Sequence, residues 1–234
     1  MWEYIYNEDF WTWEFAISSI SQQSWLLPVL VSPFVKIWTP TRRRVIAFVC
    51  FTLLMEHLST DKQIKYLFRE GVNAPWYHLL TPLLFFFMSN IFLPVITKKR
   101  FRFLRWLLPL VFVGIALLGI LDEEEFYHFP GLTVGLYSVV GILLALIYFL
   151  TLLKNLTVRY LERLPMFWVA SGLLIYLSGN FLLWISLFVV EYDRVLFGSI
   201  YRLNSGLTIF LNCFLTAAML INNPEINLKR TDLS

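Results

Sequence analysis

The chain has 234 residues, of which 58% are hydrophobic, 18% are aromatic and only 15% are charged. A soluble domain usually carries about a quarter charged residues, so this composition excludes an ordinary soluble protein. The net charge of +3 comes from basic residues clustered in short segments between apolar runs. That distribution indicates membrane topology and argues against a nucleic-acid partner.

The apolar runs predict an all-α polytopic membrane protein, a single domain built as a bundle of seven transmembrane helices. A helix needs about 20 apolar residues to cross a hydrocarbon layer roughly 30 Å thick. The candidate spans cover approximately residues 15–37, 45–64, 76–96, 103–121, 132–153, 166–190 and 197–221. We therefore expect residues 1–234 to form one transmembrane domain.

The basic residues occupy alternate connections between these spans. They are Arg42, Arg43 and Arg44; then Lys98, Lys99, Arg100, Arg102 and Arg105; then Lys154, Arg159 and Arg163; and finally Lys229 and Arg230. The positive-inside rule places all four groups in the cytosol. The amino terminus is then expected outside, together with the acidic run from Asp122 to Glu125, and the carboxyl terminus in the cytosol.

The first two spans carry unusual residues. Pro28 and Pro33 interrupt the first one, and the polar stretch from Ser18 to Ser24 must face neighbouring helices. Residues 11–24 either span the membrane or lie along its surface, and the sequence leaves both readings open. The second span has to include Glu56 and His57 to reach full length.

Two later spans have simpler expected roles. The fourth, Phe103 to Leu121, is expected to form a lipid-facing wall free of polar side chains. The fifth has small residues on one side, which predicts close helix packing. These small residues are Gly131, Gly135, Ser138 and Ala145. A second set of small residues, on the sixth span, comprises Ser171, Gly172, Ser178 and Gly179.

Ionisable side chains inside a membrane are costly, so each one is a candidate for function. Glu56 lies 12 residues after Arg44, which places it roughly 18 Å along the helix, in the outer half of the bilayer. Arg202 lies at a similar depth, and a Glu56–Arg202 pair would hold both charges there. The alternative is a pair that only fixes helix order, or an Arg202 side chain that extends to the outer interface.

The last span has one polar face, formed by Tyr201, Asn204, Ser205, Thr208, Asn212 and Thr216. In lipid this face must point inward, where it either packs against neighbouring helices or lines a cavity. Tyr176 and Asn180 on the sixth span could complete the wall of such a pocket. The predicted ligand-binding residues are Glu56, Tyr176, Asn180, Arg202, Asn204 and Ser205.

No cofactor, metal site or catalytic residue is expected. His57, His78 and His128 all fall toward the outer side, but their spacing matches no zinc motif. Cys50 and Cys213 lie in apolar runs, which excludes a disulfide framework. The last span contains no lysine, which excludes a retinal Schiff base.

Two segments carry a resemblance to a known group: residues 76–83, WYHLLTPL, and residues 166–180, MFWVASGLLIYLSGN. The chain resembles poorly characterised small bacterial seven-helix integral membrane proteins, which are similar to the sensor portions of membrane-bound histidine kinases. The resemblance implies a multi-pass protein of the bacterial inner membrane with a sensory or accessory role. Only thirteen residues follow Ile221, so we expect no attached kinase domain and signalling through a partner.

The sequence thus favours a non-enzymatic membrane sensor or accessory protein. It would bind a small molecule, lipid or proton in an outer-half polar pocket and act through a membrane or cytosolic protein partner. Membrane lipids are expected neighbours, and self-association stays open. The alternatives are a small-solute transporter or channel, and an intramembrane lipid-modifying enzyme, which would need the three histidines to converge.

Overall fold

The computed structural model describes residues 8–60, 74–97, 103–121, 126, 130–155, 160–189 and 194–221, and every regular element within them is helical. The α-helices are α1 (Glu8–Ser24), α2 (Leu26–Val31), α3 (Pro40–Thr60), α5 (Ala74–Ile96), α6 (Leu104–Ile120), α8 (Gly131–Asn155), α9 (Pro165–Val189) and α10 (Arg194–Leu220). Two short 3-10 turns, η2 (Ser32–Phe34) and η5 (Leu161–Arg163), join them. Over these residues the predicted all-α fold class is confirmed.

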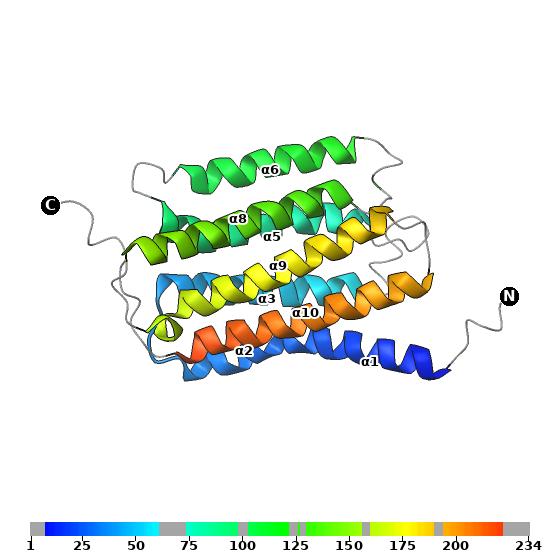
Figure 1. Cartoon of the computed structure of the whole chain (residues 1–234), viewed down its shortest axis with the longest axis horizontal. Helices are drawn as coiled ribbons and strands as arrows, with labels where there is room; N and C mark the ends of the chain where they lie inside the picture. Colours follow the sequence, from blue (N-terminus) through cyan, green and yellow to red (C-terminus); the bar gives the residue numbers. More distant parts are fainter. Residues whose placement is uncertain are drawn as a thin grey trace.

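The helices run side by side and most of them form a closed ring (Figure 1). Going round it, α3 packs on α5, α5 on α8, α8 on α9, and α9 on α10. The ring closes because α10 packs on α1 and α2, and α2 packs on α3. Side chains that point into this ring are shielded by helices on all sides.

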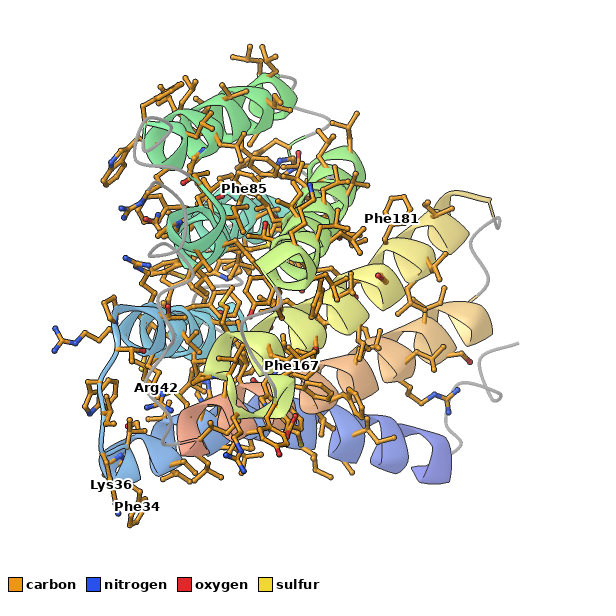
Figure 2. The ribbon with its side chains drawn as sticks, turned by 60° about the vertical axis from the view of Figure 1, so that its left-hand side comes forward. Phe34, Lys36, Arg42, Phe85, Phe167 and Phe181 are labelled. Carbon is orange, nitrogen blue, oxygen red and sulfur yellow. The ribbon has the colours of Figure 1, made fainter. Side chains whose placement is uncertain are left out.

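Helix α6 lies outside the ring, at the edge opposite α1 and α2 (Figure 1). It packs on α5 through the stacked rings of Phe112 and Phe85, whose centroids are 4.2 Å apart, and Figure 2 shows Phe85 between these two helices. The other side of α6 exposes large apolar side chains, among them Trp106, Leu110 and Leu118. This agrees with the predicted exposed wall.

Arg105 corrects one detail of that prediction. The sequence interpretation placed it in a loop and treated the wall as free of polar side chains. It lies instead in the first turn of α6, where its Nη2 donates a 3.1 Å hydrogen bond to Oδ1 of Asn90 on α5. The pair ties the outlying helix to the ring.

The first predicted span, 15–37, is not one continuous helix. Pro28 has no amide hydrogen to donate to the carbonyl of Ser24, and its ring crowds that carbonyl. Accordingly α1 ends at Ser24, Trp25 forms a turn, and α2 begins at Leu26. Since α1 packs along α10 as α2 does, it lies alongside the other helices in the bundle (Figure 1).

Small residues set the close contact between α9 and α10. A Cβ added at Gly172 would lie 2.6 Å from Cβ of Phe214, and one added at Gly179 would collide with Leu207. The predicted small-residue face on the sixth span is confirmed at these two glycines. On α8 the closest approach is at Gly141, which the sequence analysis missed, whereas Gly135 has open space around it.

Among the described residues, four helical segments are long and apolar enough to cross a membrane. They are Pro75–Ile96, Gly131–Lys154, Pro165–Leu183 and Arg202–Leu220, and Leu104–Leu118 is a shorter apolar helix. Residues 61–64, the end of the second predicted span, lie outside the described residues. The coarser prediction of a helical membrane protein is thereby supported by length and composition.

Candidate functional site

Tyr176 interacts with four other polar side chains, and these five residues come from four helices of the ring. The Tyr176 hydroxyl hydrogen-bonds the side chains of Asn180 and Thr208 and interacts electrostatically with Glu56. Tyr137 on α8 also interacts electrostatically with Tyr176. We call Glu56, Tyr137, Tyr176, Asn180 and Thr208 the Tyr176 cluster, which joins α3, α8, α9 and α10.

The hydrogen bonds of the cluster run in one direction. The Thr208 hydroxyl donates a 3.0 Å bond to the backbone carbonyl of Asn204, so its oxygen accepts the bond from Tyr176. The Asn180 amide oxygen is buried and has no hydrogen-bond partner. The bond between Asn180 and Tyr176 therefore uses the amide nitrogen, which donates to the phenol oxygen.

Asn204 adjoins the cluster at the level of Asn180. Because Tyr176 bonds Thr208 while Gly172 packs on Phe214, α9 and α10 run antiparallel. One turn beyond Tyr176 is Asn180, and one turn before Thr208 is Asn204, so the two asparagines lie at the same level. The amide oxygen of Asn204 is also buried without a hydrogen-bond partner.

The polar face of α10 points inward, as predicted. Ser205, Thr208 and Asn212 are buried, with 5%, 7% and 0% of their surfaces exposed. The Thr216 hydroxyl donates a 2.7 Å bond to the carbonyl of Asn212 on its own helix. The side chain of Tyr201 lies outside those the structure describes. The buried residues Ser205, Thr208 and Asn212 show that the polar face of α10 is turned toward the neighbouring helices.

The six predicted ligand-binding residues are placed as follows. Glu56, Tyr176 and Asn180 come together in the Tyr176 cluster, Asn204 adjoins it, and Ser205 is buried on the same helix. Arg202 donates a 3.0 Å bond to the Ser199 hydroxyl, one turn earlier on α10. Glu56 interacts electrostatically with Tyr176 and His57, and the Glu56–Arg202 pair stays a prediction.

Two features were missed by the sequence analysis. Tyr137 sits within a strongly apolar run, where no pattern distinguishes it from a core aromatic residue. The second is a hydrogen bond of 2.7 Å from the Asn212 amide nitrogen to the Ser24 hydroxyl. The polar stretch from Ser18 to Ser24 was expected to face neighbouring helices, and the burial of Ser21 and Ser24 bears this out, but their partner could not be named.

The histidines give no metal centre in the described part of the chain, where no three metal-ligating side chains cluster. His57 is exposed, and its Nδ1 lies 3.0 Å from the carbonyl of Leu53. His78 is buried beside the ring of Phe126. His128 lies outside the described residues, so convergence of all three histidines is not tested.

No family model matches this chain, and neither a curated protein nor a solved structure matches it. Over the described residues the protein is all-helical, and four of its helices are long and apolar enough to cross a membrane. Its distinguishing feature is a polar cluster that joins four helices of the ring, in which Tyr137, Asn180 and Thr208 are buried.

Proposed function

We propose that this chain is a seven-span protein of the bacterial inner membrane, with its amino terminus outside and its carboxyl terminus in the cytosol. Counting α1 and α2 as one broken column, the described helices form seven columns that run side by side (Figure 1). The basic residues occur in alternate connections of the sequence, which the positive-inside rule assigns to the cytosol. The Tyr176 cluster then lies in the outer half of the membrane.

The protein acts as a non-enzymatic sensor or accessory subunit that binds a ligand at the Tyr176 cluster. The observation that carries this proposal is the interaction of Tyr176 with Glu56, Asn180 and Thr208, which joins α3, α9 and α10. A carboxylate in the hydrocarbon region costs about 2.5–3.5 kcal/mol on insertion scales, and such residues usually mark functional sites. A cluster that only packed helices together would not need that charge.

Ligand binding at this site would change how the helices pack, because the cluster joins four of them. Helix α10 continues from Thr208 to Asn212, which contacts the end of α1. The basic cytosolic connections would pass the change to a protein partner or contact anionic lipid head groups. Because the ligand and the partner would both contact this helix bundle, the ligand could signal to the partner by favouring one of two packing arrangements of the helices.

Genetic complementation tests this function. A strain lacking the protein would be complemented with the wild type, with Glu56→Gln or with the control Thr151→Val, whose hydroxyl bonds the carbonyl of Ile147 on its own helix, and the proteomes compared. We expect Glu56→Gln to resemble the deletion, at wild-type abundance in the membrane, whereas Thr151→Val restores the wild-type pattern. A Glu56→Gln strain indistinguishable from the wild type would contradict the proposal.

A transporter is the second candidate, favoured by the broken first helix. Discontinuous helices that face polar side chains often form substrate sites in transporters, and here Ser24 at the break contacts Asn212. The polar face of α10 continues to Thr216. Solute flux in proteoliposomes that is lost in Asn212→Ala would favour this function over the sensor.

A further inference from the structure

The guanidinium of Arg105, in the first turn of α6, is held by a neutral partner. Its Nη2 donates the 3.1 Å hydrogen bond to Oδ1 of Asn90, an amide oxygen that carries no charge. The Nε of the same guanidinium is buried and has no hydrogen-bond partner in the described part of the chain. The contacts described for Arg105 therefore leave its positive charge without an acidic partner.

The two helices that hold Arg105 contain no acidic residue. The sequence has no Asp or Glu in residues 71–121, a range that includes all of α5 and α6. Helix α6 lies at the edge of the bundle and packs on α5 (Figure 1). The guanidinium is always charged and is partly buried here. An anion that neutralises it has to come from outside these two helices.

An exposed apolar surface begins directly beside Arg105. Trp106 is the next residue, and the side chains of Trp106, Leu110 and Leu117 are all exposed. At 100° per residue these three fall on one stripe that runs along α6, and we call them the α6 stripe. Tryptophan is the residue typical of the head-group level of a membrane. The surface thus has a cation at one end and an apolar stripe leading away from it.

We propose that this surface binds an anionic phospholipid of the inner leaflet, with its phosphate at Arg105 and its acyl chains along the α6 stripe. A guanidinium donates paired hydrogen bonds to phosphate oxygens, and the bond to Asn90 holds this one against α5. The stripe favours a lipid over a soluble anion, which has no apolar part to place there. The choice of leaflet rests on the orientation in the proposed function, but the site is separate from the Tyr176 cluster.

Native mass spectrometry of the purified full chain tests the lipid. The protein in detergent is titrated with phosphatidylglycerol, or with phosphatidylcholine of the same acyl chains, which has a phosphate but no net charge. We expect the wild type to bind phosphatidylglycerol more tightly, and Arg105→Gln to reduce this preference about fivefold, the effect of one basic residue on binding to anionic lipid. Arg105→Lys, which keeps the charge, should keep most of the preference.

Lys154→Gln is the matched control. It also removes one positive charge, from an exposed side chain in the last turn of α8, and in the proposed orientation this residue lies on the same side of the membrane as Arg105. The control variant should keep the wild-type preference for phosphatidylglycerol. A general attraction between basic residues and anionic lipid would instead make the two glutamine variants equal.

Hydrogen exchange in nanodiscs locates the lipid on the wild type itself. Phosphatidylglycerol should slow exchange at the start of α6 relative to phosphatidylcholine, while α9 serves as the internal reference and stays unchanged. Because this comparison needs no substitution, it tests the site even if Arg105→Gln fails to fold, which size-exclusion chromatography would detect.

The lipid site is overturned if the wild type binds the two lipids equally, if a folded Arg105→Gln keeps the full preference, or if Lys154→Gln loses as much. A dimer without bound phosphatidylglycerol would place a second copy of the chain on this face and would also overturn it. None of these results bears on the sensor function, whose failure would show as full complementation by Glu56→Gln.

Discussion

The amide nitrogen of Asn212 on α10 donates a 2.7 Å hydrogen bond to the Ser24 hydroxyl, joining two residues 188 positions apart in the sequence. Ser24 is the last residue of α1, directly before the turn at Trp25, and its hydroxyl donates in turn to the carbonyl of Ser21 at 2.6 Å. The bond therefore fixes the broken first helix against the polar face of α10.

A double-mutant cycle should detect this bond. Ser24→Ala and Asn212→Ala each remove one partner, and their effects on unfolding in detergent should couple by about 0.6 kcal/mol, the average for hydrogen bonds between membrane helices, and by no more than about 1.7 kcal/mol. Thr216→Val is the control, because its hydroxyl bonds only its own helix. Strictly additive effects of the two substitutions would contradict the structural role of the bond.

Gly172→Ala should destabilise the α9–α10 contact. The added methyl group would lie 2.6 Å from Cβ of Phe214, and this atom cannot move without its backbone. Overpacking of this kind costs about 1–3 kcal/mol. Gly135→Ala on α8, where nothing lies within 4 Å, should leave the melting temperature unchanged; equal effects of the two substitutions would rule out this close approach.

Asn90→Ala should loosen α6 from the ring. Helix α6 packs on α5, and the Arg105–Asn90 hydrogen bond is a polar contact between them. Hydrogen exchange measured by mass spectrometry should become faster in α6 and stay unchanged in α9. As a control, Thr151→Val removes a hydroxyl bonded within its own helix. Unchanged protection of α6 in Asn90→Ala would show that apolar packing alone holds it.

The sequence predicted the fold better than the site, for physical reasons. Long apolar runs impose helices because a backbone in lipid must satisfy its hydrogen bonds internally, and the spacing of polar residues on the last span correctly assigned its inward face. Which helix that face meets depends on packing between distant segments. The sequence therefore predicted Tyr176 and Asn180 as neighbours of this face but missed Tyr137 and the Ser24 partner of Asn212.

Local chemistry explains the remaining differences. Pro28 predicted a break in the first span, but only the structure shows that α1 ends at Ser24 and α2 begins at Leu26. Arg105 reads as a loop residue because it follows four other basic residues. Its guanidinium enters the bundle because Asn90 on α5 offers an acceptor, which no pattern within the fourth span reveals.

The proposed function requires that a ligand reach the Tyr176 cluster from the outer side of the membrane. Accessibility of substituted cysteines measures this directly, in a background where Cys50 and Cys213 are replaced by alanine. In right-side-out vesicles, a membrane-impermeant thiol reagent should label Asn180→Cys and leave Thr216→Cys unlabelled. An unlabelled Asn180→Cys, or equal labelling at Thr216→Cys from the outer side, would contradict the claim.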